Sequence, residues 1–378
     1  MTIIKILAAH LGYYPTPLNL TYAWGFGSIS GIILVIQSAS GLLLAMHYTP
    51  DTFGAFTSVE HIQREIIYGW LVRYTHSSGS SVFFIAVYSH IVRALFYRSF
   101  RKIALWYSGL IIFLLMMATA FLGYVLPWGS MSYWGATVIT NLFTAIPLIG
   151  DYLTAWLWGG FAIDTQTLKR FFALHFVLPF GIMAVSGIHL ILLHECGSSN
   201  PIGVCSDRDN IRFYPLYFYK DLFGVLCFLI PIYIWTIFFD PQCFMHCDNY
   251  IRADSLVTPR HIQPEWYFLP FYAILRAIPS KGGGVFFMFG SIIVFFFLPW
   301  IAPFKLCIGG YSKLWVSFFS TFLFNVLILG ILGARVVEEP YVLLSQFCTF
   351  YYFFYLLIIM PIFSMFETLL FIKKKSNN

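Results

Sequence analysis

The chain has 378 residues, of which 59% are hydrophobic, 20% are aromatic and only 10% are charged. Soluble domains carry about 25% charged residues, so this composition excludes an ordinary soluble globular protein. It indicates an integral membrane protein. The formal net charge is +6, and we expect membrane lipids rather than nucleic acid among its partners.

Eight apolar runs approach or exceed the length of about 20 residues that lets a helix cross a bilayer. In chain order they lie near residues 25–46, 79–97, 104–127, 171–193, 221–239, 285–302, 314–333 and 342–366. Two stretches between them, residues 129–160 and 264–281, are predicted to be helices that lie on the membrane surface. The expected fold class is all-α integral membrane, with eight transmembrane helices.

An even number of spans puts both termini on one side of the membrane. When the loops are assigned alternately, the terminal side has more than half of the 22 Lys and Arg residues, including Lys5, Arg98, Arg101, Lys102, Lys373, Lys374 and Lys375. The positive-inside rule therefore places both termini in the matrix or the cytoplasm. No cleavable signal peptide is evident before the first span.

Two pairs of histidines repeat one interval: His76 and His90 are fourteen residues apart, and so are His175 and His189. Fourteen helical residues return to within about 40° of the same face and rise about 21 Å, too far for one metal ion to contact both. The pattern therefore predicts two centres. Both helices run inward in this topology, so His76 pairs with His175 near the outer surface, and His90 pairs with His189 near the inner surface.

Two imidazoles on one iron fill both axial positions of a haem, which favours electron transfer over oxygen chemistry. The alternative is that the histidines only hydrogen-bond within the bundle. Ionisable groups inside a membrane are expensive, however, and are usually functional. The C-x-x-C-H attachment signature is absent, so we expect two non-covalent b-type haems.

Glycines repeat the same interval, with Gly27 and Gly41 in the first span and Gly109 and Gly123 in the third. A porphyrin edge wedged between helices needs backbone without side chains at the same two depths. The alternative is that these are ordinary helix contacts, where small residues are also common. Their match to the histidine interval favours the haem interpretation.

Two arginines complete the pattern. Arg73 lies three residues before His76, and Arg93 lies three residues after His90. Each is one turn nearer its own membrane surface, where a guanidinium would neutralise a haem propionate. The alternative is an arginine that only extends its charge to the interface.

The cysteines at 243 and 247 flank His246 in the sequence CFMHC. We interpret these as ordinary loop residues, because the further ligands of a zinc or iron–sulfur site are missing.

Longer motifs cover nearly the whole chain: GYVLPWG, MSYWGATVITNL, RFFALHFVLPF, HLILLHECGSSNP, PEWYFLPFYAILRAIPSK and VEEPY. With the histidines they resemble cytochrome b of mitochondrial type, the haem-bearing core subunit of quinol–cytochrome c oxidoreductase (respiratory complex III). The resemblance implies a low-potential haem at the outer histidine pair and a high-potential haem at the inner pair. We accordingly expect a di-haem bundle over residues 1–205, and a region over residues 206–378 that completes the quinone sites.

The resemblance implies that PEWY forms a quinol oxidation site in an outer loop. Glu265 would accept the quinol proton, a task that suits a carboxylate whose pKa is raised by burial. Pro264 would stiffen the approach, and Tyr272 and Tyr124 would line the pocket. From the residues alone, Glu265 could instead be an acid facing a helix dipole. Ser130 stands where the family usually has glutamine, which is a departure from the pattern.

On the inner side, the resemblance implies a quinone reduction site. His194 and Asp221 would bind the quinone carbonyl oxygens and deliver protons. Ser198 lies near them, and Lys220 would help to supply protons. The alternative for Asp221 is that it caps the helix that follows.

The implied activity is a Q cycle: quinol, with ubiquinone the expected type, is oxidised at the outer face, and one electron crosses through two haems to reduce quinone at the inner face. A proton gradient results. The other electron needs an acceptor that this chain lacks, so a Rieske-type iron–sulfur subunit and a cytochrome c-type subunit are expected partners, with other subunits, in a dimeric complex.

The 42 phenylalanines and the lack of a signal peptide suit an organelle-encoded, multi-pass protein of the mitochondrial inner membrane, with both termini in the matrix. A bacterial plasma membrane is the alternative.

Three rival functions are weaker. The photosynthetic relative has a separate, shorter haem protein and one more residue between its second pair of histidines, whereas both intervals here are fourteen. A transporter with a histidine proton relay would show no haem band in an optical spectrum. A haem protein without quinone chemistry would have no need of Glu265 and His194.

Overall fold

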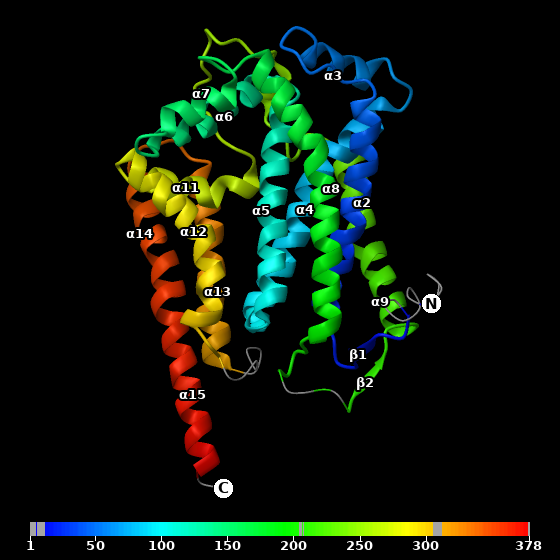
Figure 1. The fold of residues 1–378 in the computed structure, drawn as a ribbon, viewed down its shortest axis with the longest axis vertical. Helices are drawn as coiled ribbons and strands as arrows, with labels where there is room; N and C mark the ends of the chain where they lie inside the picture. Colours follow the sequence, from blue (N-terminus) through cyan, green and yellow to red (C-terminus); the bar gives the residue numbers. More distant parts are fainter. Residues whose placement is uncertain (1–4, 6–11, 204–205, 207, 305–311, 377–378) are drawn as a thin grey trace.

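Eight helices among the described residues are long and apolar enough to cross a membrane, which confirms the predicted fold class. The structure is a computed structural model that describes residue 5 and residues 12–203, 206, 208–304 and 312–376. The spans are Tyr22–Ala45, Gly69–Phe96, Ile103–Val125, Thr165–Cys196, Leu216–Phe239, Lys281–Ile301, Lys313–Gly333 and Tyr341–Leu369. They stand roughly side by side (Figure 1).

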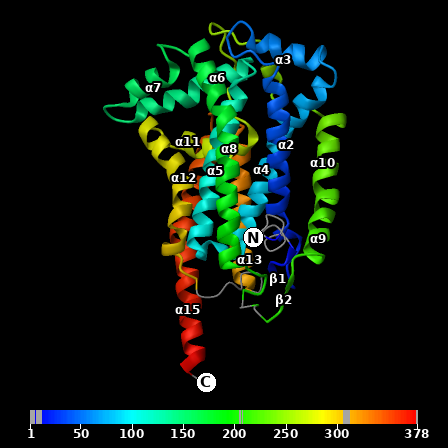
Figure 2. The ribbon, with the colours of Figure 1, turned by 45° about the vertical axis from the view of Figure 1, so that its right-hand side comes forward.

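Four long helices form the N-terminal bundle. They are α2 (Phe26–Ala45), α4 (Gly69–Phe96), α5 (Ile103–Val125) and α8 (Thr165–Cys196). The pairs α2–α4 and α5–α8 make the most extensive contacts between elements, and both views show the four helices together (Figures 1 and 2). The short turns η2 (Tyr22–Trp24) and η3 (Ser99–Arg101) precede α2 and α5.

The C-terminal half supplies four further spans. One combines α9 (Leu216–Gly224), η5 (Val225–Leu229), α10 (Ile230–Ile234) and η6 (Trp235–Phe239), and it stands at the edge of the molecule beside α2 (Figure 2). The others are α12 (Lys281–Ile301), α13 (Lys313–Gly333) and the continuous run of α14 (Tyr341–Phe354), η10 (Tyr355–Ile359) and α15 (Met360–Ser376). A large hydrophobic core joins the last three of these spans to the end of α4 and the start of α5.

Short helices gather at one end of the bundle, at the top of Figure 1. They are α3 (Ala55–Arg64), α6 (Ser130–Asn141), η4 (Leu142–Ala145), α7 (Gly150–Trp158), η7 (Cys247–Tyr250), η8 (Trp266–Phe268) and α11 (Leu269–Ala277). The opposite end has a two-stranded antiparallel sheet of β1 (Pro15–Pro17) and β2 (Asn210–Arg212), with Pro15 opposite Arg212. We call these the helix end and the strand end.

Polar residues cap several helices at their first turns. The Asp164 side chain accepts the N3 backbone amide of α8, and Thr167 accepts the backbone N–H of Asp164. Ser280 and Ser312 cap α12 and α13 in the same way, by accepting backbone N–H groups three residues on. Each cap satisfies amides that would otherwise lack partners at a helix start.

The second span begins at Gly69, ten residues before the predicted start at 79. The polar stretch RYTHSSGSS lowers the hydropathy there, but its side chains face protein rather than lipid. Ser78 and Ser81 are buried, and Ser78 donates to the carbonyl of Pro241 at 3.3 Å. His76 therefore lies inside the helix.

Three further features differ from the sequence-based expectation. The stretch 129–160 contains two helices, α6 and α7, separated by a turn. The stretch 264–281 contains η8 and the shorter helix α11. Helix α3 and the β1–β2 pair were not predicted, because short elements stabilised by partners far along the chain leave little periodic signal.

Close backbone packing fixes α11 against the end of α13. A Cβ atom added at Gly333 would collide with the backbone of Leu269, whose carbonyl oxygen it would meet first. Gly330, one turn earlier on α13, has only the ring of Pro270 near it, at 3.8 Å from an added Cβ. Only glycine allows this approach at position 333, and it fixes the start of α11, which follows Glu265 and η8 in the chain.

We predict that Gly333→Ala destabilises the protein by about 1–3 kcal/mol, the usual range for overpacking a tight core. Gly330→Ala, on the same helix, should leave stability within about 0.5 kcal/mol of the wild type. Thermal unfolding of the detergent-solubilised complex measures both. Equal stability of the two variants would show that the α11–α13 contact is not as tight as described.

Candidate functional site

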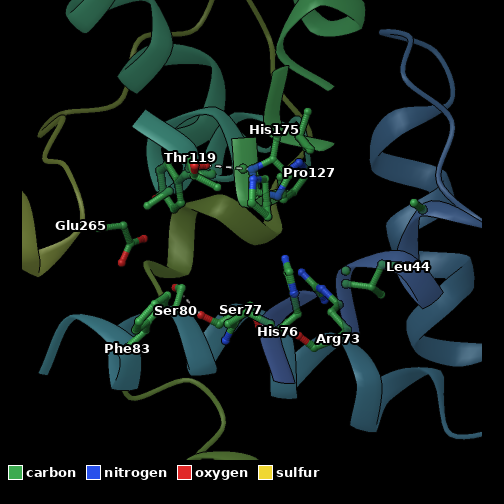
Figure 3. Close-up of a pocket in the computed structure, with 18 of the residues that line it drawn as sticks. Leu44, Arg73, His76, Ser77, Ser80, Phe83, Thr119, Pro127, His175 and Glu265 are labelled. Carbon is green, nitrogen blue, oxygen red and sulfur yellow. Dashed lines mark hydrogen bonds between the residues drawn. The ribbon is translucent and has the colours of Figure 1, made fainter. Parts of the chain in front are cut away.

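The histidine pair near the helix end is formed by His76 of α4 and His175 of α8. Their ring centroids are 6.1 Å apart and their planes cross at 87°. Nδ1 of His76 lies 3.0 Å from the Ser40 hydroxyl, and Nδ1 of His175 lies 2.8 Å from the carbonyl oxygen of Thr119. Both rings face one cavity (Figure 3), so Nε2 of each ring is the nitrogen left to act as a ligand.

The pair near the strand end repeats this arrangement. The rings of His90 and His189 have centroids 6.4 Å apart and cross at 63°. Nδ1 of His189 lies 2.8 Å from the hydroxyl of Ser108, and Nδ1 of His90 lies 3.1 Å from Nη2 of Arg93. The structure thus brings together the two pairs that the sequence predicts, one at each depth.

The spacing within each pair fits one metal ion between two imidazoles. With about 2 Å for each metal–nitrogen bond, as for imidazole on zinc, and about 1.1 Å from each nitrogen to its ring centre, centroids would be about 6.2 Å apart. The structure has 6.1 Å and 6.4 Å. Histidine ligands usually have a hydrogen-bond acceptor on Nδ1, which fixes the tautomer and the ring orientation. Three of the four rings have an oxygen atom there, and His90 has Arg93 instead.

Each of the four predicted glycines faces one of the four histidines. A Cβ atom on Gly41 would lie 2.9 Å from Cε1 of His76, and those on Gly27 and Gly109 would lie 3.2 Å from Cε1 of His90 and His189. A Cβ atom on Gly123 would collide with the ring of His175. Backbone without a side chain therefore surrounds both centres, as a flat cofactor between helices requires.

Both predicted arginines are partly buried beside the histidines, and each has one buried donor nitrogen that is not used. Nη1 of Arg73 and Nε of Arg93 have no hydrogen-bond partner among the described residues. Arg73 lies 5.7 Å from the ring of Tyr250, and Arg93 lies 5.2 Å from the ring of Trp24. A buried cation without an anion is costly, so these side chains fit a group that brings carboxylates.

The cavity at the outer pair has a volume of about 270 Å³. Its walls include His76, His175 and Arg73, and it extends to Glu265 and Tyr124. In Figure 3 the Glu265 carboxylate lies across the cavity from the histidine rings. Burial raises the pKa of Glu265 to about 7, and a hydrogen bond with Tyr124 partly opposes this rise.

Other residues predicted for this site lie around the cavity or outside it. Tyr272 is not among the lining residues; its hydroxyl donates to Ile262 O at 3.3 Å, and its ring lies 4.6 Å from the Arg276 guanidinium. Pro264 directly precedes the Glu265 that lines the wall. Ser130 is buried, and its backbone N–H donates to Ile251 O at 2.8 Å.

At the strand end, the residues predicted for quinone reduction have separate neighbours. His194 stacks on Tyr14 with centroids 4.2 Å apart, and the Tyr14 hydroxyl donates to the carbonyl of Leu193 at 3.2 Å. Ser198 lies near the same tyrosine. Asp221 accepts from the Ser28 hydroxyl at 2.5 Å.

The ammonium group of Lys220 does not bond to Asp221 but donates to the carbonyl of Leu20 at 2.5 Å. The alternative that Asp221 caps a helix is wrong, because α9 begins at Leu216. Tyr14 and Ser28 were missed, since a lone tyrosine or serine has no distinctive sequence signal.

Comparison with known proteins decides the family. Residues 11–197 match the family described as cytochrome b/b6/petB, and residues 252–353 match cytochrome b(C-terminal)/b6/petD. The chain belongs to the cytochrome b family. Membership implies b-type haem.

Similar proteins agree over nearly the full length. A cytochrome b of Rickettsia prowazekii is 54% identical over 97% of this chain and 92% of its own length. One from Phytophthora megasperma is 53% identical over 98% and 97%. A solved structure titled hyperthermophilic respiratory Complex III has a TM-score of 0.90 and 29% identity, and covers 97% of both chains.

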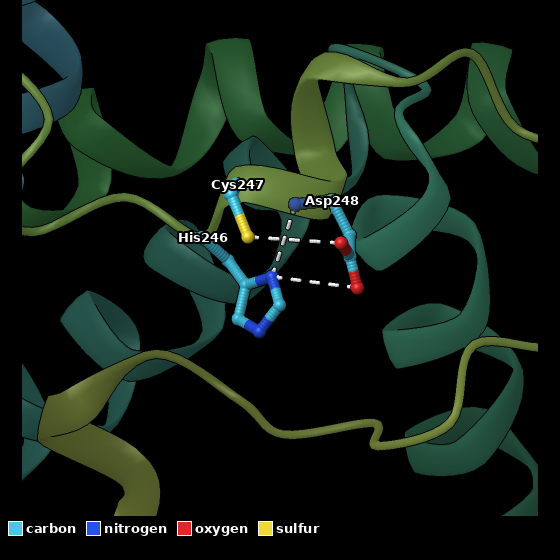
Figure 4. A group of neighbouring side chains, drawn as sticks. All are labelled: His246, Cys247 and Asp248. Carbon is cyan, nitrogen blue, oxygen red and sulfur yellow. Dashed lines mark hydrogen bonds and ion pairs between the residues drawn. The ribbon is translucent and has the colours of Figure 1, made fainter.

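In this cytochrome b, the loop before PEWY has a small polar cluster. The ligand atoms of His246, Cys247 and Asp248 lie within 4.8 Å of one another (Figure 4). They already bond among themselves: Cys247 Sγ donates to Asp248 Oδ1 at 3.6 Å, and the Asp248 backbone N–H donates to His246 Nδ1 at 3.2 Å. His246 also lines the outer cavity, with Asn249 and Tyr250, which the sequence analysis did not predict.

We predict that Gly27→Val reduces the b-type haem content of this cytochrome b, because the added side chain would enter the space beside His90. Gly31→Val on the same helix is the matched control, since an added Cβ there meets nothing within 4 Å. The haem content of the purified complex, determined as pyridine haemochrome, measures the effect. Full haem content in the Gly27 variant would refute the role of this glycine.

Proposed function

We propose that this chain is the subunit of respiratory complex III that oxidises quinol at one membrane face and reduces quinone at the other. Two non-covalent b-type haems would connect the two sites. The observation that carries the proposal is the presence of two partly buried histidine pairs in one helix bundle, one pair toward each end of the membrane span. The family match and the complex III neighbour support it.

His76 and His175 would hold the outer haem, and His90 and His189 the inner one. When bound, each haem iron would take up and pass on one electron. The hydroxyls of Ser40 and Ser108 already donate to backbone carbonyls, so these oxygens and the carbonyl oxygen of Thr119 would accept from the Nδ1 atoms of three ligands. Protons held on Nδ1 would leave Nε2 unprotonated and able to bind a metal.

The fourth ligand differs. Arg93 can only donate, so its contact with Nδ1 of His90 requires the ring proton on Nε2. With Nε2 as the ligand, that proton would move to Nδ1, and Arg93 would be released to pair with a carboxylate. Arg73 is placed for the same task beside the outer pair.

Glu265 would accept a proton from quinol in the outer cavity. A general base works best when its pKa is near the working pH, and burial raises the pKa of the Glu265 carboxyl to about 7. Tyr124 would orient the carboxylate, and Pro264 would limit the motion of the loop. Tyr272 would not line the cavity. It would hold the loop in place by donating to the carbonyl of Ile262.

His194 and Asp221 would bind quinone and supply protons at the strand end. Tyr14 holds the imidazole by stacking, and Ser28 holds the carboxylate. Ser198 and Lys220 would assist from the same end. The side chains of His194 and Asp221 both lie on helices, α8 and α9, which suits the binding of a flat quinone.

A Rieske-type iron–sulfur subunit and a cytochrome c-type subunit are the proposed partners, in a dimeric complex with further subunits. Among the described residues, only His246, Cys247 and Asp248 form a group of three or more possible metal ligands, and one cysteine does not make an iron–sulfur ligand set. We propose the mitochondrial inner membrane as the location, with the strand end in the matrix. The division into 1–205 and 206–378 stays a prediction; residues 204–205 lie outside the described part.

We predict that His189→Leu removes one b-type haem per chain and leaves the outer haem in place, because the two centres share no ligand. Leucine also fits an apolar membrane helix, so the bundle should persist. Reduced-minus-oxidised spectra of purified complex measure the two bands. Survival of both bands would contradict the ligand pairing.

We predict that Glu265→Gln slows quinol oxidation about 10²-fold, the lower end of the range for a general base. In the wild type, the carboxylate fraction rises with pH through about 7, so the rate should rise there and the variant should lose this rise. Glu65→Gln, an exposed acid of the helix end, is the matched control. Turnover per haem across pH 5–9 measures both, and an unchanged profile in the Glu265 variant would exclude its role as base.

A further inference from the structure

A buried ion pair joins the strand end of α4 to α15. Arg98, two residues beyond α4, donates from Nη1 and Nη2 to the two carboxylate oxygens of Glu367, at 2.5 and 2.9 Å. The Arg98 side chain is fully buried, and that of Glu367 is 12% exposed. The guanidinium carbon lies 4.0 Å from the centre of the Phe304 ring and 4.3 Å from that of Trp315.

The backbone at Arg98 has a conformation that arginine rarely adopts. Its φ of 57° lies in the left-handed region, which glycine enters freely and other residues rarely adopt. A glycine would therefore suit the turn better. The chain instead has an arginine there, held by a bidentate carboxylate and two aromatic rings, while Trp315 Nε1 donates to the nearby carbonyl of Phe96 at 2.9 Å.

The ion pair lies much closer to the inner histidine pair than to the outer one. A helix rises about 1.5 Å per residue, so Arg98 lies about 12 Å along the axis from His90 and about 33 Å from His76. Charges inside a low-dielectric protein are screened far less than exposed charges. An uncompensated charge at Arg98 would therefore act mainly on the centre that His90 holds.

We propose that Glu367 tunes the electron affinity of the inner haem by neutralising Arg98. The inference rests on the proposed function, in which His90 and His189 hold that haem. Paired, the two charges largely cancel at the distance of the centre. Without the Glu367 carboxylate, the region would gain one net positive charge and favour the reduced haem, because reduction adds one negative charge. Glu367 touches neither haem nor quinone and is a tuning residue, not a catalytic one.

The test is a potentiometric titration of both b-type bands in the purified complex. Glu367→Gln keeps an amide oxygen for the guanidinium and removes only the negative charge. The double variant Arg98→Met/Glu367→Gln removes both charges and puts a flexible apolar side chain between the two rings. Asp209→Asn, an exposed acid at the strand end, controls for loss of any acid on that side.

We expect Glu367→Gln to raise the midpoint potential of the inner haem, with a much smaller shift of the outer one. The double variant should return the inner potential to near the wild-type value, and Asp209→Asn should shift neither band. A purely structural role predicts a larger defect in the double variant than in the single one.

An unshifted inner potential in Glu367→Gln, at full haem content, would overturn the proposal. Equal shifts of both bands, or a double variant that stays shifted, would overturn it as well. The proposed function is tested separately by the wild type, which must show two b-type bands before any variant is compared.

Discussion

Each imidazole ring that lies inside a membrane has two nitrogens, and both need a partner. An unpaired polar group costs several kcal/mol in an apolar surrounding, and four such rings lie in α4 and α8 of this protein. Serine hydroxyls, a backbone carbonyl and an arginine contact the four Nδ1 atoms. The Nε2 atoms are left for a further partner, and a metal ion between the two rings of each pair would satisfy both rings at once.

Most of the N-terminal bundle follows from this requirement. Two ligand pairs at two depths need two parallel helices that each offer one face, and α4 and α8 are those helices. The flat group between them needs room, which the glycines of α2 and α5 give by facing each histidine with bare backbone. The propionates of such a group would need cations, and Arg73 and Arg93 each have one buried donor nitrogen that is not used within the described part of the chain. The same helices thus provide ligands, space and charge.

The outer cavity joins this arrangement to the quinone chemistry. It is lined both by the outer histidines and by Glu265, so an electron acceptor and a proton acceptor would border one space from opposite sides. Glu265 comes from the loop before α11, and α11 is fixed by the glycine contact on α13. The C-terminal helices therefore position the base, while the N-terminal helices position the centre.

The sequence predicted what depends on periodicity and missed what depends on distant partners. The four histidines, four glycines and two arginines share a fourteen-residue interval or a one-turn offset, which a single helix makes visible. The start of α4 was placed too late, because its serines lower the hydropathy although they face protein. Hydropathy cannot distinguish a serine that faces protein from one that faces water. Three contacts join residues that are 180 to 269 positions apart, and no local pattern links them. They are Tyr14 with His194, Ser28 with Asp221, and Arg98 with Glu367.

The most direct test is the number and ligation of haems bound per chain. The complex would be purified, its haem measured as pyridine haemochrome against quantitative amino-acid analysis of this chain, and the oxidised iron examined by electron paramagnetic resonance. The account predicts two b-type haems per chain, both low-spin as expected for iron with two imidazole ligands. One haem per chain, or a high-spin signal from intact complex, would contradict it.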